Sequence, residues 1–573
     1  MIFNIEVNNK TIRAKKGDTI LETLRRNGIS VPTLCNMETF SPTGACRICV
    51  VEVDGHDDLI PACSHPVDEW MKIHTHSPKV IRARRTIVEL LLSSHPDDCL
   101  YCIRNKNCEL QTLAEELGIR ERRLPIVKKN LKKDPSCSSI VRDPDKCILC
   151  GRCVRMCKEK IGVSTFDFIG KGMKTIVGPT FNNLLNISNC ITCGQCIMVC
   201  PTGALHEKEH IGQVHEALQN PEKYTVVQIS PTISVSLAEE FNVKSGKEMD
   251  GLLVATLRKI GFKKVFKTAF AADIMVLQIV EELVSRIEQN ENLPMFSSDC
   301  PAFIKYMEEY HPDMLHHISV YKSPQQIMGS LIKHHFSRQQ KIKAEQIHSV
   351  SLMPCTAKKF EAQREENTHK GIQDVDSVLT TRELARLIRL YGLDIQQAEP
   401  ELADSPFAIR SSAGKIIGAS GGVAEAVYRT LYHTMTGKNL LNFKITALRS
   451  NKNVKELHSK IGKTKIGIAA VNGLENAKDL IRQIKAGRDD LQFIEVMVCP
   501  GSCINGGGQP ISKNKEAVKA RMKSLYDIDE KESIKVSYKN PAVKDLFEKY
   551  DGKEKESFRE KLKTSYRKRD VLL

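Results

Sequence analysis

Apolar and polar residues alternate in two short segments at the start of the chain, which predicts β-strands at residues 2–7 and 11–16. Asparagines join the two segments, as expected for a tight turn. A stripe of leucine and isoleucine follows at 18–28 and predicts a helix, with Asp18 as its N-cap and Gly28 at its end. Strand, turn, strand and helix in this order predict a small β-grasp domain.

The second half of the chain has a different hydrophobic pattern. From about residue 210 onward, short and nearly continuous apolar runs rich in β-branched residues predict strands buried on both faces, at 224–230, 348–354, 465–473 and 491–499. Several runs lead into helical patterns such as 475–487. This alternation predicts a large α/β domain with parallel or mixed sheets and with its functional loops at the carboxyl ends of the strands.

The length of the chain and the spacing of its cysteines indicate a multidomain metalloprotein. A chain of 573 residues exceeds one hydrophobic core, so we expect a multidomain protein. Its 20 cysteines cluster with metal-binding spacings, unlike those of a secreted disulfide scaffold. The first residues lack the basic and apolar segments of a secretory signal, and no apolar run reaches the roughly 18 residues that span a bilayer. We therefore expect a soluble cytoplasmic protein with no membrane partner.

The formal net charge of +16 favours acidic partners. No nucleic acid is expected, because aromatic residues make up only 5% of the chain and no basic stretch is interleaved with stacking side chains. Two basic stretches stand out, at 120–133 and 553–569. We interpret the second as a solvated face, and the first, which lies between cysteine groups, as a docking surface for an acidic ferredoxin.

Two cysteine runs share the spacing C-x2-C-x2-C-x3-C, and Pro201 follows the second run. This pattern binds 4Fe4S clusters, and in two-cluster ferredoxins the fourth cysteine of each run binds the other cluster. Structural zinc is disfavoured, since zinc modules usually pair two cysteines with two distant ones. The chain should therefore contain a bacterial two-cluster ferredoxin-like domain. The expected ligand sets are Cys147, Cys150, Cys153 and Cys200 for one cluster, and Cys190, Cys193, Cys196 and Cys157 for the other.

Two further cysteine groups precede these runs. The first has the spacing C-x10-C-x2-C-x13-C, which differs from the usual plant-type count and still predicts a 2Fe2S centre. The second reads H-x3-C-x2-C-x5-C, where three cysteines need a fourth ligand and imidazole binds iron well, so it predicts a 4Fe4S cluster. Cys137 fits no group, and we interpret it as a small buried side chain. The two groups are Cys35, Cys46, Cys49 and Cys63, and His95, Cys99, Cys102 and Cys108.

The last four cysteines lie on turns rich in glycine, proline or serine. Two of them, Cys355 and Cys499, follow predicted strands, where α/β proteins place reactive groups. By spacing alone, four thiolates at one site could bind a further 4Fe4S cluster or a structural zinc, and each could also be an ordinary buried cysteine. The four are Cys300, Cys355, Cys499 and Cys503.

Three segments place these cysteines in a specific context: SSDCPAF at 297–303, MPCTAKKFE at 353–361 and CPGSCINGGGQP at 499–510. In this order they resemble the signature segments of the FeFe hydrogenases. The N-terminal groups resemble the accessory-cluster modules of the long, monomeric, clostridial-type members, so the resemblance spans nearly the whole chain. It implies four domains: a β-grasp 2Fe2S ferredoxin-like domain at 1–80, a small helical His/Cys 4Fe4S domain at 81–125, a two-cluster 4Fe4S ferredoxin-like domain at 126–210, and a catalytic α/β H-cluster domain at 211–573.

The resemblance also implies a six-iron active centre, the H-cluster, which interconverts dihydrogen with protons and electrons that are exchanged with ferredoxin. The last four cysteines then hold its 4Fe4S part. Cys503 bridges to a diiron unit that carries CO, cyanide and an azadithiolate, and hydrogenase maturation proteins supply that unit. Lys358 can donate a hydrogen bond to a cyanide, and the glycines of 506–510 let the backbone approach the cluster. The other residues at positions of the surrounding shell are Met353, Gln325, Ser323, Met497, Pro231 and Ser230.

The chain departs from the family along its proton route. The residue before the first ligand is usually a cysteine that relays protons, and here it is Asp299. A carboxyl group relays protons only if burial brings its pKa from ~3.9 toward the working pH. Glu282 and Ser319 match the outer route, but Ile279 stands at the position of the inner glutamate and cannot carry a proton. Water or a longer reach from Asp299 must then fill the gap.

The pocket departs from the family at two further positions. Ala424 stands where methionine is common, and Ile417 stands where phenylalanine is usual. We expect the altered pocket to change the catalytic bias, the turnover rate, or the response to inhibitors and oxygen.

Three other functions fit parts of the sequence. A dihydrogen sensor tends to carry an output domain, and none is evident after the last ligand segment. An electron-transfer subunit related to the large peripheral subunit of complex I shares the N-terminal cysteine groups but lacks the C-terminal four. The hydrogenase-like iron–sulfur assembly factor of eukaryotes resembles the last domain but lacks the long N-terminal extension. The sequence favours a ferredoxin hydrogenase over all three.

Overall fold

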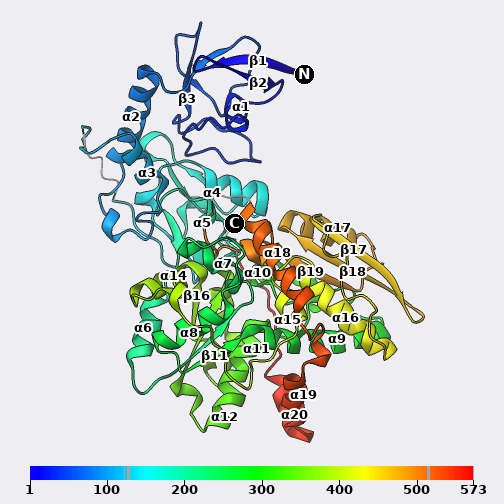
Figure 1. The fold of residues 1–573 in the computed structure, drawn as a ribbon. Helices are drawn as coiled ribbons and strands as arrows, with labels where there is room; N and C mark the ends of the chain where they lie inside the picture. The colour runs from blue at the N-terminus through cyan, green and yellow to red at the C-terminus, as the bar shows by residue number, and fades with distance from the viewer. Residues whose placement is uncertain (122, 126–129, 513–515, 572–573) are drawn as a thin grey trace.

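A computed structural model describes residues 1–121, 123–125, 130–512 and 516–571. Figure 1 shows three tiers: the N-terminal domain, a cysteine-rich middle, and a large α/β body that contains most of the chain. Within the basic stretch at 120–133, residues 122 and 126–129 lie outside the described residues. No helix of the described residues is long and apolar enough to cross a membrane.

The N-terminal domain has five strands: β1 (Ile2–Val7), β2 (Lys10–Lys15), β3 (Val50–Val53), β4 (Ile60–Pro61) and β5 (Lys72–His74). They form a mixed sheet in the order β2-β1-β5-β3-β4, and α1 (Ile20–Arg26) packs its apolar stripe into the same core. The predicted N-cap of α1 is wrong. Thr19 is the cap, because its hydroxyl accepts the backbone N–H of Glu22 while the Glu22 carboxylate accepts the N–H of Thr19. Asp18 pairs with Arg26 instead.

The middle tier consists of short elements around the cysteine runs. Helices α2 (Pro78–Ser93) and α3 (Glu109–Glu116) join the N-terminal domain to it. Gly151 and Gly194 precede the short helices of the two runs with φ of 70° and 71°, a left-handed conformation that favours glycine. The other elements of this tier are α4 (Arg152–Arg155), α5 (Gln195–Val199), β6 (Ile140–Arg142), β7 (Asp167–Ile169), β8 (Ile176–Gly178) and β9 (Leu205–Glu207).

Two four-stranded sheets form the centre of the body. The strands are β10 (Tyr224–Ile229), β11 (Lys264–Lys267), β12 (Met295–Phe296), β13 (Ile347–Met353), β16 (Ser377–Thr380), β17 (Val454–Ile461), β18 (Thr464–Asn472) and β19 (Phe493–Met497). The first sheet, in the order β11-β10-β13-β16, is entirely parallel. In the second, in the order β12-β19-β18-β17, only β17 runs antiparallel. The four apolar runs become β10, β13, β18 and β19, which confirms the predicted α/β class with parallel and mixed sheets.

Helices surround these sheets. The longest, α9 (Thr268–Gln289), is buried along most of its length and packs against three shorter helices, α11 (Pro324–Ser330), α15 (Ser412–Ile416) and α16 (Gly422–Thr436). The predicted helix at 475–487 forms as α17 (Leu474–Lys485). The remaining elements of the body are α6 (Ile211–Gln219), α7 (Ile233–Ser236), α8 (Asp250–Ile260), α10 (Pro301–Tyr310), α12 (Ser337–Gln340), α13 (Ala357–Ala362), β14 (Thr368–His369), β15 (Ile372–Gln373), α14 (Thr381–Leu390), α18 (Glu516–Lys531), α19 (Pro541–Glu548) and α20 (Gly552–Glu560).

The basic stretch at 553–569 is not simply a solvated face, which corrects the prediction. After α20 the chain packs along the body, where the Tyr566 hydroxyl donates to the Ser319 carbonyl at 2.7 Å. The Arg569 guanidinium donates to Glu308 at 2.6 Å, and Glu308 is fully buried. The sequence could not show this docking, because the acceptors lie more than two hundred residues away in the chain.

Candidate active site and electron path

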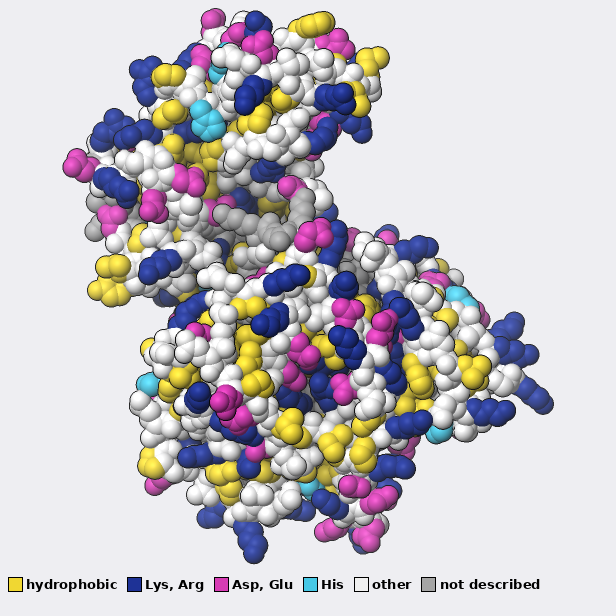
Figure 2. Space-filling view, viewed as in Figure 1, with side chains coloured by type: hydrophobic (Ala, Val, Ile, Leu, Met, Phe, Trp, Pro, Cys, Tyr) yellow, Lys and Arg dark blue, Asp and Glu magenta, His cyan; other side chains and the backbone are white. Residues whose placement is uncertain are grey.

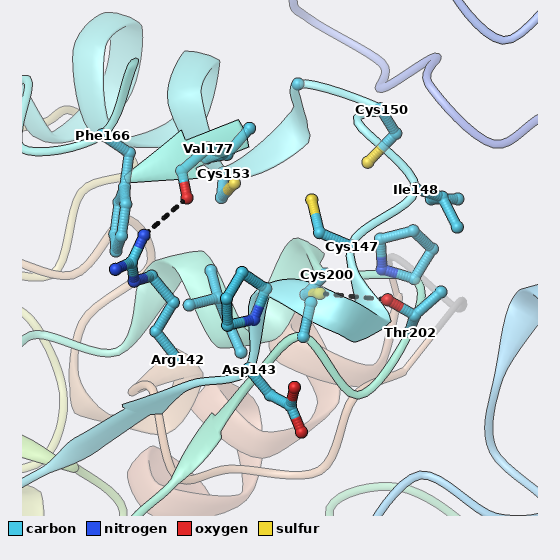
Figure 3. A pocket seen from close by; sticks show the side chains of 15 residues that line it. Arg142, Asp143, Cys147, Ile148, Cys150, Cys153, Phe166, Val177, Cys200 and Thr202 are labelled. Atoms are coloured by element: carbon cyan, nitrogen blue, oxygen red, sulfur yellow. Dashed lines mark hydrogen bonds between the residues drawn. The ribbon is translucent and has the colours of Figure 1, made fainter. Parts of the chain in front are cut away.

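The predicted cross-paired cysteines surround one cavity in the middle tier. Cys147 and Cys150 lie on the loop before α4, Cys153 lies within α4, and Cys200 follows α5 (Figure 3). Burial raises the pKa of the Cys150 thiol to about 12, and the neighbouring Cys200 adds to the shift. Thiols of this kind stay protonated at neutral pH unless a bound metal takes up their negative charge.

The second set is equally buried. Burial holds the pKa of Cys196 well above its ordinary value, and Cys190, Cys193, Cys153 and Cys157 add to the shift in that order. Cys157 also raises the pKa of Cys190 and of Cys193, after burial as the largest cause. The last cysteine of the first run therefore lies among the first three of the second run, as the cross-paired ligand sets require. Cys137 is buried in the same core, as predicted.

The two groups nearer the N-terminus also assemble locally. The Cys35 thiol contacts those of Cys46 and Cys63, and Cys63 in turn contacts Cys49. In the other group the Cys102 thiol raises the pKa of both Cys99 and Cys108, in each case after burial as the larger cause, and His95 is buried. Across the described residues, no three Cys, His, Asp or Glu side chains surround a point that would hold a single metal ion.

Hydrogen bonds tie the cysteine groups together. Arg155, in the first run, donates to the carbonyls of Ser41 and Cys35 in the N-terminal domain. Arg104, in the His/Cys group, donates to the carbonyl of Cys200 at 2.9 Å. Both N-terminal groups therefore contact the two-cluster region directly.

The second run contacts the body in the same way. The Thr356 hydroxyl donates to the carbonyl of Thr192 at 2.8 Å, and the Lys305 ammonium donates to that of Cys190 at 2.5 Å. The Cys193 thiol is close enough to Cys499 to raise its pKa, after burial and Cys355 as the larger causes. A continuous set of cysteine groups thus leads into the body.

A cavity in the body brings together the last four cysteines. It lies at the carboxyl ends of β10, β13 and β19, where the sequence predicts the functional loops. Burial raises the pKa of Cys355 to about 12, with Cys300 adding to the shift. The cavity is lined by Cys300, Cys355, Cys499 and Cys503 together with the predicted shell residues Ser230, Pro231, Gln325, Met353, Lys358 and Met497. Ser323 does not line it and instead donates to Glu361 at 2.9 Å.

Lys358 is held at the edge of this cavity by a buried network. Its ammonium donates to the Glu361 carboxylate at 3.1 Å and to the backbone carbonyl of Asp299 at 3.0 Å. Glu361 and Asp299 raise the pKa of Lys358 in spite of its burial, so the side chain carries a positive charge. A fixed cation is thereby aimed at a largely apolar cavity.

Asp299 lines the cavity next to Cys300, and its side chain is 15% exposed. Burial raises its pKa above the ordinary aspartate value, while Lys358, at 3.9 Å, opposes the shift. A proton relay needs a carboxyl group whose pKa is raised in this way.

The outer residues of the expected proton route, Glu282 and Ser319, are in contact. The inner position is taken by the apolar side chain of Ile279. The Ser319 hydroxyl donates to Glu282 at 2.6 Å, and Glu282 also pairs with Arg286 at 2.6 Å. Ile279 is fully buried in the apolar core beside α11 and α16. Ala424 and Ile417 are buried in that same core, and only Ile417 lines the cavity.

Sequence reasoning missed two buried carboxylates near the cavity. Glu361 is the last residue of the MPCTAKKFE segment, and its place three residues after Lys358 on α13 was an available signal. Glu495 interrupts the apolar run of β19 and accepts the backbone N–H groups of Gly421 and Ala424. Burial raises the pKa of Glu495 to about 7, and Asp299 adds to the shift.

Family models match almost the whole chain. The model for the iron only hydrogenase large subunit, C-terminal domain, matches residues 223–507, and the model for the iron hydrogenase small subunit matches 515–569. A 2Fe-2S iron-sulfur cluster binding domain matches 2–78. A region of NADH-ubiquinone oxidoreductase-G that binds an iron-sulfur cluster matches 84–123, and a 4Fe-4S dicluster domain matches 146–204.

Individual relatives match the chain from end to end. It is 40% identical to the NADP-reducing hydrogenase subunit HndD of Solidesulfovibrio fructosivorans, with 100% of both chains covered. It is 35% identical to iron hydrogenase 1 of Clostridium pasteurianum, with 96% of this chain and 97% of the relative covered. The chain belongs to the FeFe hydrogenase family. An apo FeFe-hydrogenase HydA1 variant from Chlamydomonas reinhardtii superposes with a TM-score of 0.57 at 29% identity, covering 64% of this chain and 100% of that one.

The body cavity fits the H-cluster expected of an FeFe hydrogenase. Its four thiols, two buried and two half-buried, suit a 4Fe4S cluster, and glycines let the segments around the cavity pack closely against one another. A Cβ at Gly418 would lie 2.1 Å from Thr232, and one at Gly506 would lie 2.5 Å from the carbonyl of Pro354. The buried Gln325 carbonyl oxygen has no hydrogen-bond partner among the described residues. Because the hydrogenase match runs along the whole chain, none of the alternative functions is favoured.

Proposed function

We propose that this protein is a cytoplasmic FeFe hydrogenase that interconverts dihydrogen with protons and electrons. The carrying observation is the body cavity itself: four cysteine thiols and the Lys358 cation face one largely apolar space, and Cys193 of the two-cluster region lies against it. Cysteines that cluster with metal-binding spacings, unlike those of a secreted disulfide scaffold, support a cytoplasmic setting.

The residues that line the body cavity would hold the cofactor. Cys300, Cys355, Cys499 and Cys503 would hold the 4Fe4S part of the H-cluster, with Cys503 shared by a diiron unit that carries CO, cyanide and an azadithiolate. When bound, the H-cluster supplies an open iron site and an amine that together split dihydrogen heterolytically. Lys358 would donate to a cyanide, Met353 and Met497 would exclude water, and Asp299 would hold a proton at the cavity wall.

Four accessory clusters would connect this cavity to the surface, namely one 2Fe2S and three 4Fe4S. The 2Fe2S set and the His/Cys set each contact the two-cluster region, so electrons have two entrances. The domain limits at 80, 125 and 210 separate these modules from one another and from the body.

The electron partner we favour is an acidic ferredoxin, because the chain carries a net charge of +16. A second candidate follows from the relative HndD, whose name describes a subunit of an NADP-reducing hydrogenase and which matches this chain end to end. Comparing ferredoxin reduction with NADP⁺ reduction under dihydrogen, in the native complex and in the isolated chain, distinguishes the two partners.

The test of the function uses protein loaded by maturation proteins. Infrared bands of CO and cyanide should show the assembled diiron unit, and the protein should oxidise dihydrogen with an oxidised dye and evolve it from a reduced one. Intact bands with neither activity would contradict the proposal. The Cys499→Ser variant serves as the control that lacks a proposed cluster ligand.

A further inference from the structure

A second, smaller cavity lies next to the body cavity, and Pro301 lines both. It measures about 20 Å3, which is room for one water molecule. The Ser298 hydroxyl and the Gln326 amide line it, and neither has a hydrogen-bond partner among the described residues. Buried polar groups without partners are costly, and a small polar space of this kind is suited to binding water.

Glu361 separates the small cavity from the cluster site. Its carboxylate lines the small cavity and accepts from Lys358, which lines the large one. Burial raises the pKa of Glu361, while Lys358 and Ser323 oppose the shift. The carboxyl group is therefore more easily protonated than an exposed glutamate.

The opposite wall of the small cavity leads outward. Lys322 lines it and donates to Asp374 at 2.7 Å. Asp374 is 1% exposed, and its second oxygen lies 4.0 Å from the His334 Nε2 atom. The His334 and His369 rings are 5.1 Å apart, and His369 lies on β14 at the half-exposed surface.

The charges around this outer segment favour neutral groups that can pass protons. Burial raises the pKa of Asp374 to about 6, Asp376 adds to the shift, and the cations of Lys322 and Lys333 oppose it. Burial lowers the pKa of His334 to about 3, and the remaining causes are Lys561, His369, Lys322 and Arg338. His334 is therefore neutral at working pH, and a neutral imidazole has one N–H and one free nitrogen, so it can take up a proton at one nitrogen as it releases one from the other.

We propose that these groups form a proton route that bypasses Ile279. The route rests on the proposed function. Its members, from the surface inward, are His369, His334, Asp374, Lys322, the water site at Ser298 and Gln326, and Glu361, whose carboxylate accepts from Lys358 at the edge of the cluster cavity. At each step one N–H or O–H bond breaks as another forms, and every group accepts one proton as it releases one, so no electron is transferred and no charge accumulates.

The first test measures proton exchange at the loaded cluster. The matured protein under dihydrogen in D2O should form HD without any electron carrier. Asp374→Asn and Gln326→Leu should each lower this rate by about 100-fold, the scale of a lost acid–base group, with the CO and cyanide bands unchanged. Asp313→Asn, an exposed carboxylate that pairs with Lys485 and contacts no member of the route, should exchange like the wild type.

The second test needs no diiron unit. Infrared difference spectra between acidic and alkaline pH should show a protonated carboxyl band that is absent in Asp374→Asn and present in Asp313→Asn. A missing band in the wild type would contradict the route. So would wild-type exchange in both Asp374→Asn and Gln326→Leu while Glu282→Gln slows it. A wild-type protein with intact CO and cyanide bands but no exchange would instead overturn the proposed function, and the route with it.

Discussion

Asp299 shows how its surroundings set the chemistry of one side chain. An exposed aspartate is ionised at neutral pH, and burial at the cavity wall raises the pKa of this one while Lys358 opposes the change. The cation is also engaged by Glu361, which leaves Asp299 with only part of its stabilisation. The surroundings of this carboxyl group thus move its pKa upward, in the direction that a proton relay at this position requires.

Replacing Asp299 tests this relay. Asp299→Cys should keep dihydrogen evolution and shift its pH profile, because a thiol titrates in a different range. Asp299→Asn keeps the size but carries no exchangeable acid, so the rate should fall by about 100-fold. If both variants retain the wild-type rate and pH profile, Asp299 does not relay protons.

Glu308 gives a second prediction, on stability and pH. Burial favours its neutral form, but Arg364 and Arg569 hold its pKa below the ordinary value. The ionised Glu308 therefore stabilises the folded protein at any pH above its pKa in the unfolded chain, which is about 4.3. This stabilisation is lost as the pH falls through the lower pKa that Glu308 has in the folded protein. Glu308→Gln leaves two guanidinium groups without their acceptor and should cost about 3–5 kcal/mol at neutral pH.

Hydrogen exchange of amides in α10 measures this loss without assuming two-state unfolding. The difference between the wild type and Glu308→Gln should shrink toward acidic pH. A constant difference at every pH would contradict the assignment. Asp313→Gln, whose exposed partner is Lys485, provides a surface-pair control with a small expected effect.

At the scale of elements, local sequence and distant contacts contribute differently. The apolar runs at 224–230 and 491–499 predict strands correctly, because a strand that is buried on both faces of a sheet needs apolar residues at nearly every position. The docking of Tyr566 on Ser319 and the water site at Gln326 could not be predicted, since each depends on elements far apart in the chain. The cysteine groups could be predicted because metal-binding spacings are local.

The cap of α1 provides a prediction at this scale. Thr19→Ala removes the hydroxyl that accepts the Glu22 N–H, leaves the backbone N–H of residue 19 on the Glu22 carboxylate, and should cost about 1 kcal/mol. Amide exchange within α1 measures the change. Asp18→Asn, which removes only the surface pair with Arg26, is the matched control and should cost less. Equal losses in the two variants would contradict Thr19 as the cap.

At the scale of the whole molecule, the three tiers form one path for electrons. The space-filling view shows the N-terminal tier set apart from the body by a hollow, with basic side chains scattered over the body (Figure 2). Arg155, Arg104 and Thr356 join successive cysteine groups across the tier boundaries. The arrangement places the proposed catalytic cavity at the inner end of the path and the N-terminal clusters at its outer end.

Electron paramagnetic resonance of the matured protein under dihydrogen alone tests this account most directly. The account predicts that dihydrogen, with no dye added, reduces the accessory clusters, so signals of reduced 2Fe2S and 4Fe4S centres appear in the wild type and not in Cys499→Ser. A protein with intact CO and cyanide bands whose accessory clusters stay oxidised under dihydrogen would contradict it.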